Sequence, residues 1–270
     1  MTPRSLFSTP PLWREHRYPL ELAALMRSRT YRGEGIPDGG GQPVFLIPGF
    51  LAGDDSLTVM TRWLRRHGYY TSRAGIRSNI DCSEAAVDRL AERLETMAET
   101  QGRKVAIIGQ SRGGNFAKVL AVRRPDLVSG IVTLGSPQLD PVRVHPLVRA
   151  QVYAVGALGT LRIKGLFKHS CLWGECCRTF WDELRGPIPD GVGYLSIYSR
   201  TDGVVDWRAC LDPVADHLEI DSSHCGMSVH RKAFRAVADV LADFRAREAS
   251  QRRRRRTAAP AARPGRARAA

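Results

Sequence analysis

The segment around residue 111 has the residue types and the spacing of a serine nucleophile. Gly109-Gln110-Ser111-Arg112-Gly113 fits the pattern Gly-x-Ser-x-Gly and directly follows an apolar run, VAII, at 105–108. In a nucleophile elbow the serine occupies a sharp turn from a strand into a helix, and the two glycines let these elements approach closely. Residues 115–124 predict that helix, which ends at Pro125. The pattern indicates attack by the Ser111 hydroxyl on an acyl group.

An acid and a base are expected after the serine, in that chain order. Residues 192–199 (VGYLSIYS) predict a buried strand that leads to Asp202. A shorter predicted strand at 217–220 leads to His224, in a loop that opens a helix. We therefore predict that His224 takes the proton of Ser111, and that Asp202 orients the imidazole and stabilises its charged form.

Other acids could fill the acid position. Asp206 and Asp221 lie close to the predicted acid and base in the sequence, and Asp202-Gly203 is also a common turn pair. Asp202 is preferred because it follows directly on the strand whose end should carry the acid.

The oxyanion of an acyl-transfer intermediate needs two backbone N–H groups aimed at one point. One is expected from Arg112, the residue after the nucleophile. The other is expected from Phe50, in the loop Pro48-Gly49-Phe50 that follows a predicted strand at 43–47. The alternative is an ordinary Pro-Gly turn at 48–49.

The elements that must position these residues alternate between strands and helices, which predicts a mostly parallel sheet flanked by helices, the α/β class. Two helices show an apolar stripe at helical spacing, interpreted as core packing. The stripe residues are Val87, Leu90, Leu94 and Met97 in the first, and Val229, Ala233, Val237, Leu241 and Phe244 in the second. Residues 1–40 are interpreted as an N-terminal extension, 41–249 as one catalytic domain and 250–270 as a disordered Arg-rich tail.

Between residues 140 and 190 the alternation lapses. We predict a helical cap insertion there, which would act as a lid that excludes water and shapes an apolar pocket. The alternative is an extra pair of surface helices with no role in substrate choice.

Five segments resemble the lipase and esterase branch of the α/β-hydrolase superfamily, in particular bacterial triacylglycerol lipases and hydrolases related to GPI-inositol deacylase. They are FLIPGF (45–50), IIGQSRGG (107–114), VTLGSP (132–137), YSRTDGVV (198–205) and SSHCGM (222–227). The resemblance implies the α/β-hydrolase fold and a Ser-His-Asp ester hydrolase that uses neither a metal nor an organic cofactor.

The sequence departs from that family at three positions. Pro48 stands where a histidine is usual before the oxyanion residue, and Gln110 stands where histidine is common before the serine. Arg112 is larger and more polar than the usual residue. Its charge suggests a substrate that carries negative charge.

Six cysteines admit more than one interpretation. They are Cys82, Cys171, Cys176, Cys177, Cys210 and Cys225. The spacing is interpreted as not favouring zinc, because structural zinc sites prefer paired cysteines with two to four residues between them and adjacent cysteines rarely share an ion. One hypothesis is a disulfide from Cys171 to Cys176 or Cys177, with a second between Cys210 and Cys225. The other is free thiols, as expected in a reducing compartment.

The N-terminal residues lack the apolar stretch of a signal peptide, and no run of 18 apolar residues occurs, so a cytoplasmic protein is predicted.

Residues 251–270 contain eight arginines and no acidic residue, so they supply +8 of the net charge of +14. This tail is either inert or a tether to an anionic membrane surface. Nucleic-acid binding is less favoured, because the remaining charge is spread along the chain.

The leading hypothesis is a serine hydrolase of acyl or lipid esters that works through an acyl-enzyme. An acyltransferase or thioesterase on the same scaffold is an alternative, because the attacking alcohol or water is not encoded in the triad. A non-catalytic basic protein that binds membranes or nucleic acids is the alternative from another class.

Overall fold

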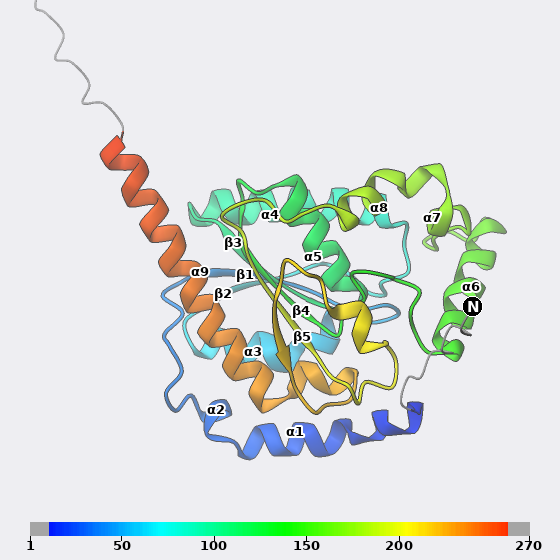
Figure 1. The fold of residues 1–270 in the computed structure, drawn as a ribbon, viewed down its shortest axis with the longest axis horizontal. Helices are drawn as coiled ribbons and strands as arrows, with labels where there is room; N and C mark the ends of the chain where they lie inside the picture. Colours follow the sequence, from blue (N-terminus) through cyan, green and yellow to red (C-terminus); the bar gives the residue numbers. More distant parts are fainter. Residues whose placement is uncertain (1–10, 259–270) are drawn as a thin grey trace, which may run out of the picture.

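The computed structural model describes residues 11–258 and has one parallel sheet with helices on both faces (Figure 1). Its six strands follow the order β2-β1-β3-β4-β5-β6, and every neighbouring pair is parallel. The strands are β1 Pro43–Ile47, β2 Tyr70–Arg73, β3 Val105–Gln110, β4 Val128–Leu134, β5 Gly193–Tyr198 and β6 Asp216–Glu219. The carboxyl ends of parallel strands meet at one edge, where the predicted site residues should gather.

Two layers of helices cover the sheet. Figure 1 shows α4 (Ser83–Gln101), α5 (Arg112–Arg123) and α8 (Arg178–Arg185) on one face, and α1 (Tyr18–Arg27), α3 (Thr58–Arg66) and α9 (Arg231–Ala258) on the other. The remaining helices are α2 (Arg29–Arg32), α6 (Pro146–Thr160) and α7 (Ser170–Trp173). Short 3-10 turns are η1 (Leu12–Arg17), η2 (Asp54–Leu57), η3 (Glu175–Cys177), η4 (Trp207–Cys210) and η5 (Cys225–Val229).

The period-2 alternation of strand side chains divides the core between these two layers. In β1, Phe45 and Ile47 pack against the α4–α5 layer, whereas Val44 and Leu46 pack against the α3–α9 layer. Both predicted apolar stripes are buried in these layers. The predicted α/β-hydrolase architecture is therefore confirmed. One strand was not predicted: β2 is a short edge strand, YTSR, in which only Thr71 is buried, so it lacks an apolar signal.

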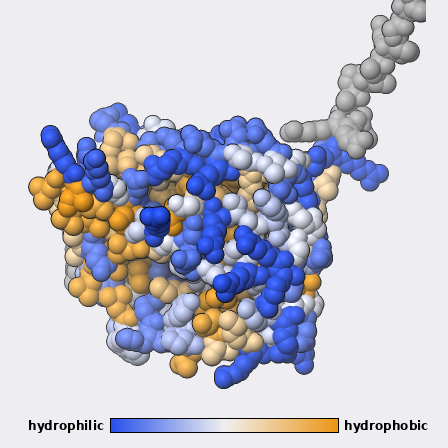
Figure 2. All heavy atoms as spheres, turned by 180° about the vertical axis from the view of Figure 1, so that it is seen from behind, coloured by the Kyte–Doolittle hydropathy of each residue, from blue (hydrophilic) through white to orange (hydrophobic). Residues whose placement is uncertain are grey.

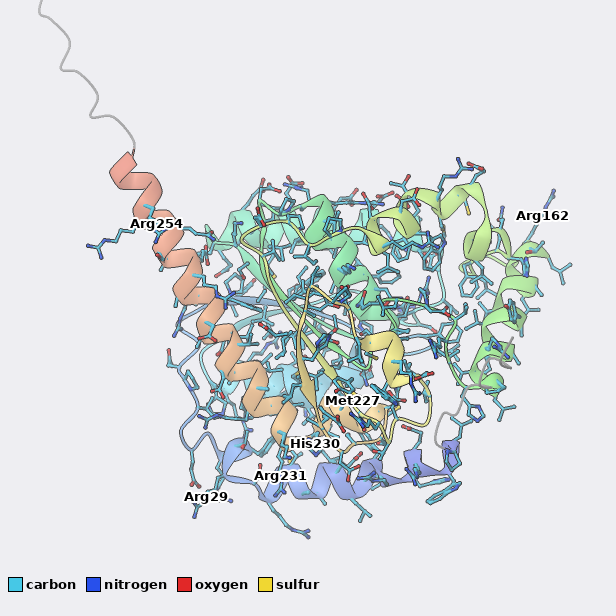
Figure 3. All side chains as sticks on the ribbon, viewed as in Figure 1. Arg29, Arg162, Met227, His230, Arg231 and Arg254 are labelled. Atoms are coloured by element: carbon cyan, nitrogen blue, oxygen red, sulfur yellow. The ribbon has the colours of Figure 1, made fainter. Side chains whose placement is uncertain are left out.

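The last helix is longer than the sequence suggested. The disordered tail was predicted from residue 250, but α9 continues to Ala258, while residues 259–270 lie outside the described part. The correction has a simple cause, because arginine and alanine are strong helix formers and a helix already in place is extended easily. Figure 3 shows Arg254 on the end of α9 that projects beyond the rest of the structure.

The region between residues 140 and 190 is helical, with α6, α7, η3 and α8. Large apolar side chains are exposed here: Leu147, Tyr153, Leu158, Leu161 and Ile163. Figure 2 shows apolar atoms gathered on the side of the molecule where α6 and α7 lie. Among residues 11–258, none of the helices has the length and hydropathy needed to cross a bilayer.

Candidate active site

Ser111 occupies a strained turn between β3 and α5. Its φ of 52° and ψ of −124° lie outside the regions that non-glycine residues ordinarily adopt. A Cβ on Gly109 would come within 2.4 Å of the Gly113 carbonyl oxygen, and one on Gly113 within 2.2 Å of the Ile47 carbonyl oxygen. Both positions therefore require glycine, because the backbone approaches too closely for a side chain, as expected for an elbow. The Ser111 N–H donates a 2.8 Å hydrogen bond to the Leu134 carbonyl, which holds the turn in place.

His224 and Asp202 are brought together although 22 residues separate them. His224 Nδ1 lies 2.7 Å from Asp202 Oδ2, and both side chains are buried. Asp202 Oδ1 accepts hydrogen bonds from the backbone N–H groups of Val204 and Val205, at 2.7 and 2.8 Å. A carboxylate held this way keeps Nδ1 protonated and leaves Nε2 as the basic nitrogen of the imidazole.

The pKa of His224 is raised above 6.5. Burial of the ring lowers it, but the charge and hydrogen bond of Asp202 outweigh burial, and Glu15 adds to the increase. Gly135, at a φ of +56°, leaves room for the pair, since a Cβ there would lie 3.1 Å from both Asp202 Oδ2 and His224 Nδ1. The same Cβ would lie 3.1 Å from Cε of Met227, which Figure 3 labels.

The two rival acids have other partners. Asp206 accepts a 2.8 Å hydrogen bond from Arg143 Nε and caps η4 through the backbone N–H of Arg208. Asp221 pairs with Arg17 at 3.0 Å and lies on the surface. Neither carboxylate contacts the imidazole of His224, so the geometry favours Asp202.

The loop after β1 passes directly over the serine. A Cβ on Gly49 would lie 3.0 Å from Ser111 Cβ, which shows how closely the backbone approaches the nucleophile. Phe50 follows in a bridge with Asn79, whose amide nitrogen donates a 2.8 Å hydrogen bond to the Pro48 carbonyl. Asn79 therefore supports the loop from the side where the sequence lacks the usual histidine. Arg112 begins α5, so its backbone N–H belongs to the unpaired first turn of that helix.

The Arg112 side chain forms hydrogen bonds with other residues of the protein. Its Nη1 donates to the carbonyl and side-chain oxygens of Asn79, both at 2.9 Å, and Nη2 donates to the Asp81 carbonyl and to Ser83 Oγ. The guanidinium also lies over the Phe167 ring, 5.4 Å from its centroid. Burial lowers the Arg112 pKa to about 10, which leaves it charged at neutral pH. These hydrogen bonds hold the guanidinium against residues 79–83. The suggestion that Arg112 favours an anionic substrate stays a prediction.

Two acidic residues of the N-terminal segment hold the histidine loop, and the sequence analysis missed both. Glu15 accepts hydrogen bonds from the backbone N–H groups of Gly203, His224 and Cys225, at 3.1, 2.9 and 3.1 Å. Glu21, which is buried, accepts 2.8 and 2.5 Å hydrogen bonds from the backbone and hydroxyl of Ser223. The segment counted as an extension thus fixes the loops of both the predicted acid and the predicted base.

We expect Glu15→Gln to lower kcat on the order of 10- to 100-fold with a smaller change in KM, because small displacements of a catalytic group are costly. Glu15 also raises the pKa of His224, so the midpoint of the pH–rate profile should fall in this variant, an effect that loss of packing alone would not produce. Steady-state kinetics across pH measure both quantities. Glu34→Gln, at a solvent-exposed surface ion pair, is the control. An unchanged kcat and midpoint in Glu15→Gln would show that the segment does not position His224.

Ser111 lies between two pockets. The first, of about 240 Å³, is largely apolar and is enclosed by the region of residues 140–190. Its walls include Val144, Val148, Val152, Phe167, Leu172 and Trp181. The second, of about 430 Å³, is bounded by Glu15 and Tyr18 of the N-terminal segment and by the loop after β1. Ser111, Phe50 and His224 border both pockets, so a substrate could place one part on each side of the serine.

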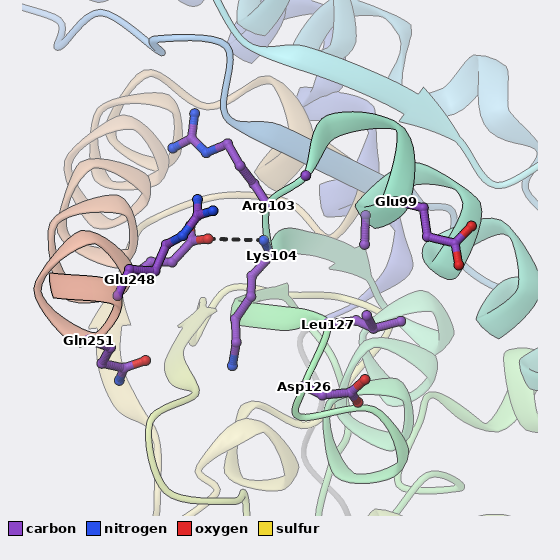
Figure 4. A pocket seen from close by; sticks show the side chains of 10 residues that line it. Glu99, Arg103, Lys104, Asp126, Leu127, Glu248 and Gln251 are labelled. Carbon is purple, nitrogen blue, oxygen red and sulfur yellow. Dashed lines mark hydrogen bonds between the residues drawn. The ribbon is translucent and has the colours of Figure 1, made fainter. Parts of the chain in front are cut away.

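A further pocket, of about 320 Å³, lies where α4, β4 and α9 meet (Figure 4). It is lined by charged side chains that include Glu99, Arg103 and Asp126, and the Lys104 backbone N–H donates a 3.0 Å hydrogen bond to Glu248. None of the predicted site residues borders it.

Of the two hypotheses for the cysteines, the structure fits free thiols. All six are free thiols, including Cys210 and Cys225. Cys171 and Cys176 lie 3.4 Å apart at Sγ, but their neighbours include a cysteine from outside the cap. Cys171 and Cys176 have four residues between them, a spacing that zinc sites do allow. Cys82 is distant in the sequence, and the fold brings it to the same place.

Comparison with known proteins shows the family of this chain. The model of the family named Esterase, described as "Putative esterase", matches residues 52–202, more than half of the sequence. The chain belongs to this family. The matched range includes Ser111 and ends at Asp202.

Curated relatives resemble part of this chain, and solved structures share its fold. Triacylglycerol lipases of Pseudarthrobacter phenanthrenivorans and Burkholderia plantarii are 30% identical over 104 residues, which is 35% of this chain and 33% and 29% of theirs. The match thus spans about a third of the length of these relatives. A Bacillus licheniformis lipase in its mature form has a TM-score of 0.58 at 16% identity, covering 76% of this chain and 94% of its own. A metagenomic carboxyl esterase has a TM-score of 0.52 at 16% identity, covering 92% and 96%. These two structures show the shared fold.

Proposed function

We propose that this protein hydrolyses carboxylic esters with apolar acyl groups through a Ser111–His224–Asp202 triad. One observation carries the proposal: Ser111 and His224 border the same apolar pocket, and Asp202 bonds to the far side of the imidazole. His224 would remove the Ser111 proton as the serine attacks the ester carbonyl, then give that proton to the departing alcohol. Water, activated by the same histidine, would then release the acid from the acyl-enzyme.

The oxyanion is assigned to the backbone N–H groups of Phe50 and Arg112. Gly49 packs against the Ser111 Cβ, so the Phe50 amide is carried past the serine at short range. Arg112 contributes an N–H at the N-terminus of α5, where the helix dipole also favours negative charge.

The region of residues 140–190 is proposed as a lid over the acyl pocket. Its inward side chains are apolar, which suits an acyl chain and excludes water from the serine. Its exposed side also carries apolar residues, including Leu147, Leu158 and Leu161, as expected of a surface that meets lipid. Lipid esters are therefore the proposed substrates. Two further points stay predictions: that the Arg-rich end of the chain binds an anionic membrane surface, and that the protein is cytoplasmic.

The test is hydrolysis of p-nitrophenyl esters from acetate to palmitate by the full-length protein. We expect turnover, with a preference for medium or long chains because the walls of the acyl pocket are largely apolar. A preference for acetate would contradict the lipid assignment, and no turnover on any ester would contradict ester hydrolysis itself.

We expect the rate to rise with pH as His224 loses its proton, with a midpoint above 6.5. The direction follows from the raised pKa of His224: below its pKa the imidazole is protonated and cannot accept the serine proton. A pH profile of kcat/KM on one ester measures the midpoint for the free enzyme. A rate that does not change between pH 5 and 9 would exclude His224 as the base.

A further inference from the structure

Four cysteines meet where the capping region joins the sheet domain. Cys171 lies in α7, Cys176 and Cys177 lie in η3, and Cys82 immediately precedes α4. The four Sγ atoms all lie within 4.8 Å of one another. Three of these separations are 3.4 Å (Cys171–Cys176), 3.5 Å (Cys82–Cys177) and 3.9 Å (Cys176–Cys177).

These separations match a tetrahedral thiolate site. A zinc–sulfur bond of about 2.3 Å places the four sulfur atoms of a tetrahedron about 3.8 Å apart. A disulfide instead requires sulfur atoms about 2.05 Å apart. Cys176 contacts two different cysteines and Cys177 contacts Cys82, so the sulfurs form one compact cluster and not two separate pairs. Cys176 and Cys177 are adjacent in the sequence, but their Sγ atoms lie 3.9 Å apart, which is the separation that two ligands of one ion need. We propose that these four cysteines bind one structural zinc ion.

The surroundings suit the negative charge that four thiolates and a zinc ion would carry. The buried Arg112 guanidinium interacts electrostatically with Cys177, Cys82 and Cys171. The backbone of Ala85 and Glu84, in the first turn of α4, forms hydrogen bonds with the Cys82 thiol. Hydrogen bonds of this kind from the backbone orient metal-binding thiolates and favour their charged form.

The ion would join the cap to the part of the domain that carries the oxyanion loop. Cys82 lies between Asp81 and Ser83, which both accept hydrogen bonds from Arg112. A 2.8 Å hydrogen bond from the Phe167 N–H to the Ile80 carbonyl already links the cap to this segment. A structural zinc ion with four protein ligands would hold residues 171–177 against Cys82. It would have no open position for substrate, so the proposed triad would not need the metal for its chemistry.

The proposal is tested by the metal content of untagged, full-length protein purified under reducing conditions. We expect about one zinc per chain by plasma mass spectrometry. Replacement of zinc by Co²⁺ should produce the intense visible absorption of a tetrahedral cobalt–thiolate site. Cys82→Ser and Cys176→Ser should lose most of the bound metal, and Cys225→Ser, which removes an exposed cysteine outside the cluster, should keep it.

Other results would overturn the proposal. Reduced wild-type protein with four titratable cluster thiols and no zinc after incubation with Zn²⁺ would exclude the site. Iron in place of zinc, or metal-free protein containing disulfides between Cys82 and Cys177 and between Cys171 and Cys176, would also contradict it. Cys82→Ser could fail to fold. In that case the proposal is decided by the Co²⁺ spectrum of the wild type and by the metal content of Cys176→Ser, which replaces an exposed cysteine of the cluster. None of these measurements depends on ester hydrolysis, so the zinc site and the proposed activity can fail separately.

Discussion

Replacing Ser111 with alanine is expected to reduce kcat by about 10⁵- to 10⁶-fold, because no covalent intermediate can form without the hydroxyl. KM should change much less, since the walls of the two pockets remain. Alanine also removes little volume, and the positive φ of residue 111 is set by its surroundings, so the fold should persist. The measurement is hydrolysis of the preferred p-nitrophenyl ester by purified wild type and Ser111→Ala.

A matched control separates loss of the nucleophile from loss of a buried hydroxyl. Ser129 is buried on β4, borders none of the pockets around Ser111, and its substitution by alanine should leave kcat near the wild-type value. A fluorophosphonate probe should label wild type on the peptide that contains Ser111 and should not label Ser111→Ala. Equal activity in wild type and Ser111→Ala would mean that another group is the nucleophile.

The sequence was informative wherever a functional residue directly follows a strand. Ser111, Asp202 and His224 were predicted because each comes after an apolar run, and a parallel sheet brings the ends of its strands to one edge. The fold places all three at that edge, with Asp202 against His224. Local patterns of this kind suffice when the architecture itself supplies the long-range contacts.

Contacts between segments without such a pattern were not predictable. Glu15 and Glu21 occur in an N-terminal segment that resembles any amphipathic surface helix, and their roles depend on where α1 docks against the histidine loop. Cys82 lies 89 residues before Cys171, its first partner in the cap, so spacing could not reveal it. Arg112 was judged by its position beside the serine, whereas its guanidinium extends toward residues 79–83.

Asp202→Asn is expected to lower kcat on the order of 10³- to 10⁴-fold while the protein stays folded. The neutral amide cannot accept a charge-assisted hydrogen bond from the His224 Nδ1–H, and it cannot stabilise the imidazolium that forms as the serine attacks. The shape of the side chain is retained, and one oxygen can still accept from Val204 and Val205. Circular dichroism and thermal unfolding report the fold, and steady-state kinetics report the loss.

The pH profile of this variant distinguishes a catalytic effect from a general loss of structure. In the wild type, burial lowers the pKa of His224 and Asp202 more than offsets it. Without the negative charge of Asp202, the effect of burial dominates and the pKa of His224 falls. The residual activity of Asp202→Asn should therefore have its pH midpoint at a lower pH than the wild type. A partly unfolded enzyme would instead lose activity without moving the midpoint.

Asp206→Asn provides the comparison, because Asp206 is equally buried and lies four residues away but bonds to Arg143 and to the turn of η4. It should affect stability more than kcat. If Asp206→Asn removed activity and Asp202→Asn did not, the acid would have to be reassigned. That result would require the loop after β5 to rearrange when substrate binds, since Asp202 is the carboxylate in contact with His224 in the free protein.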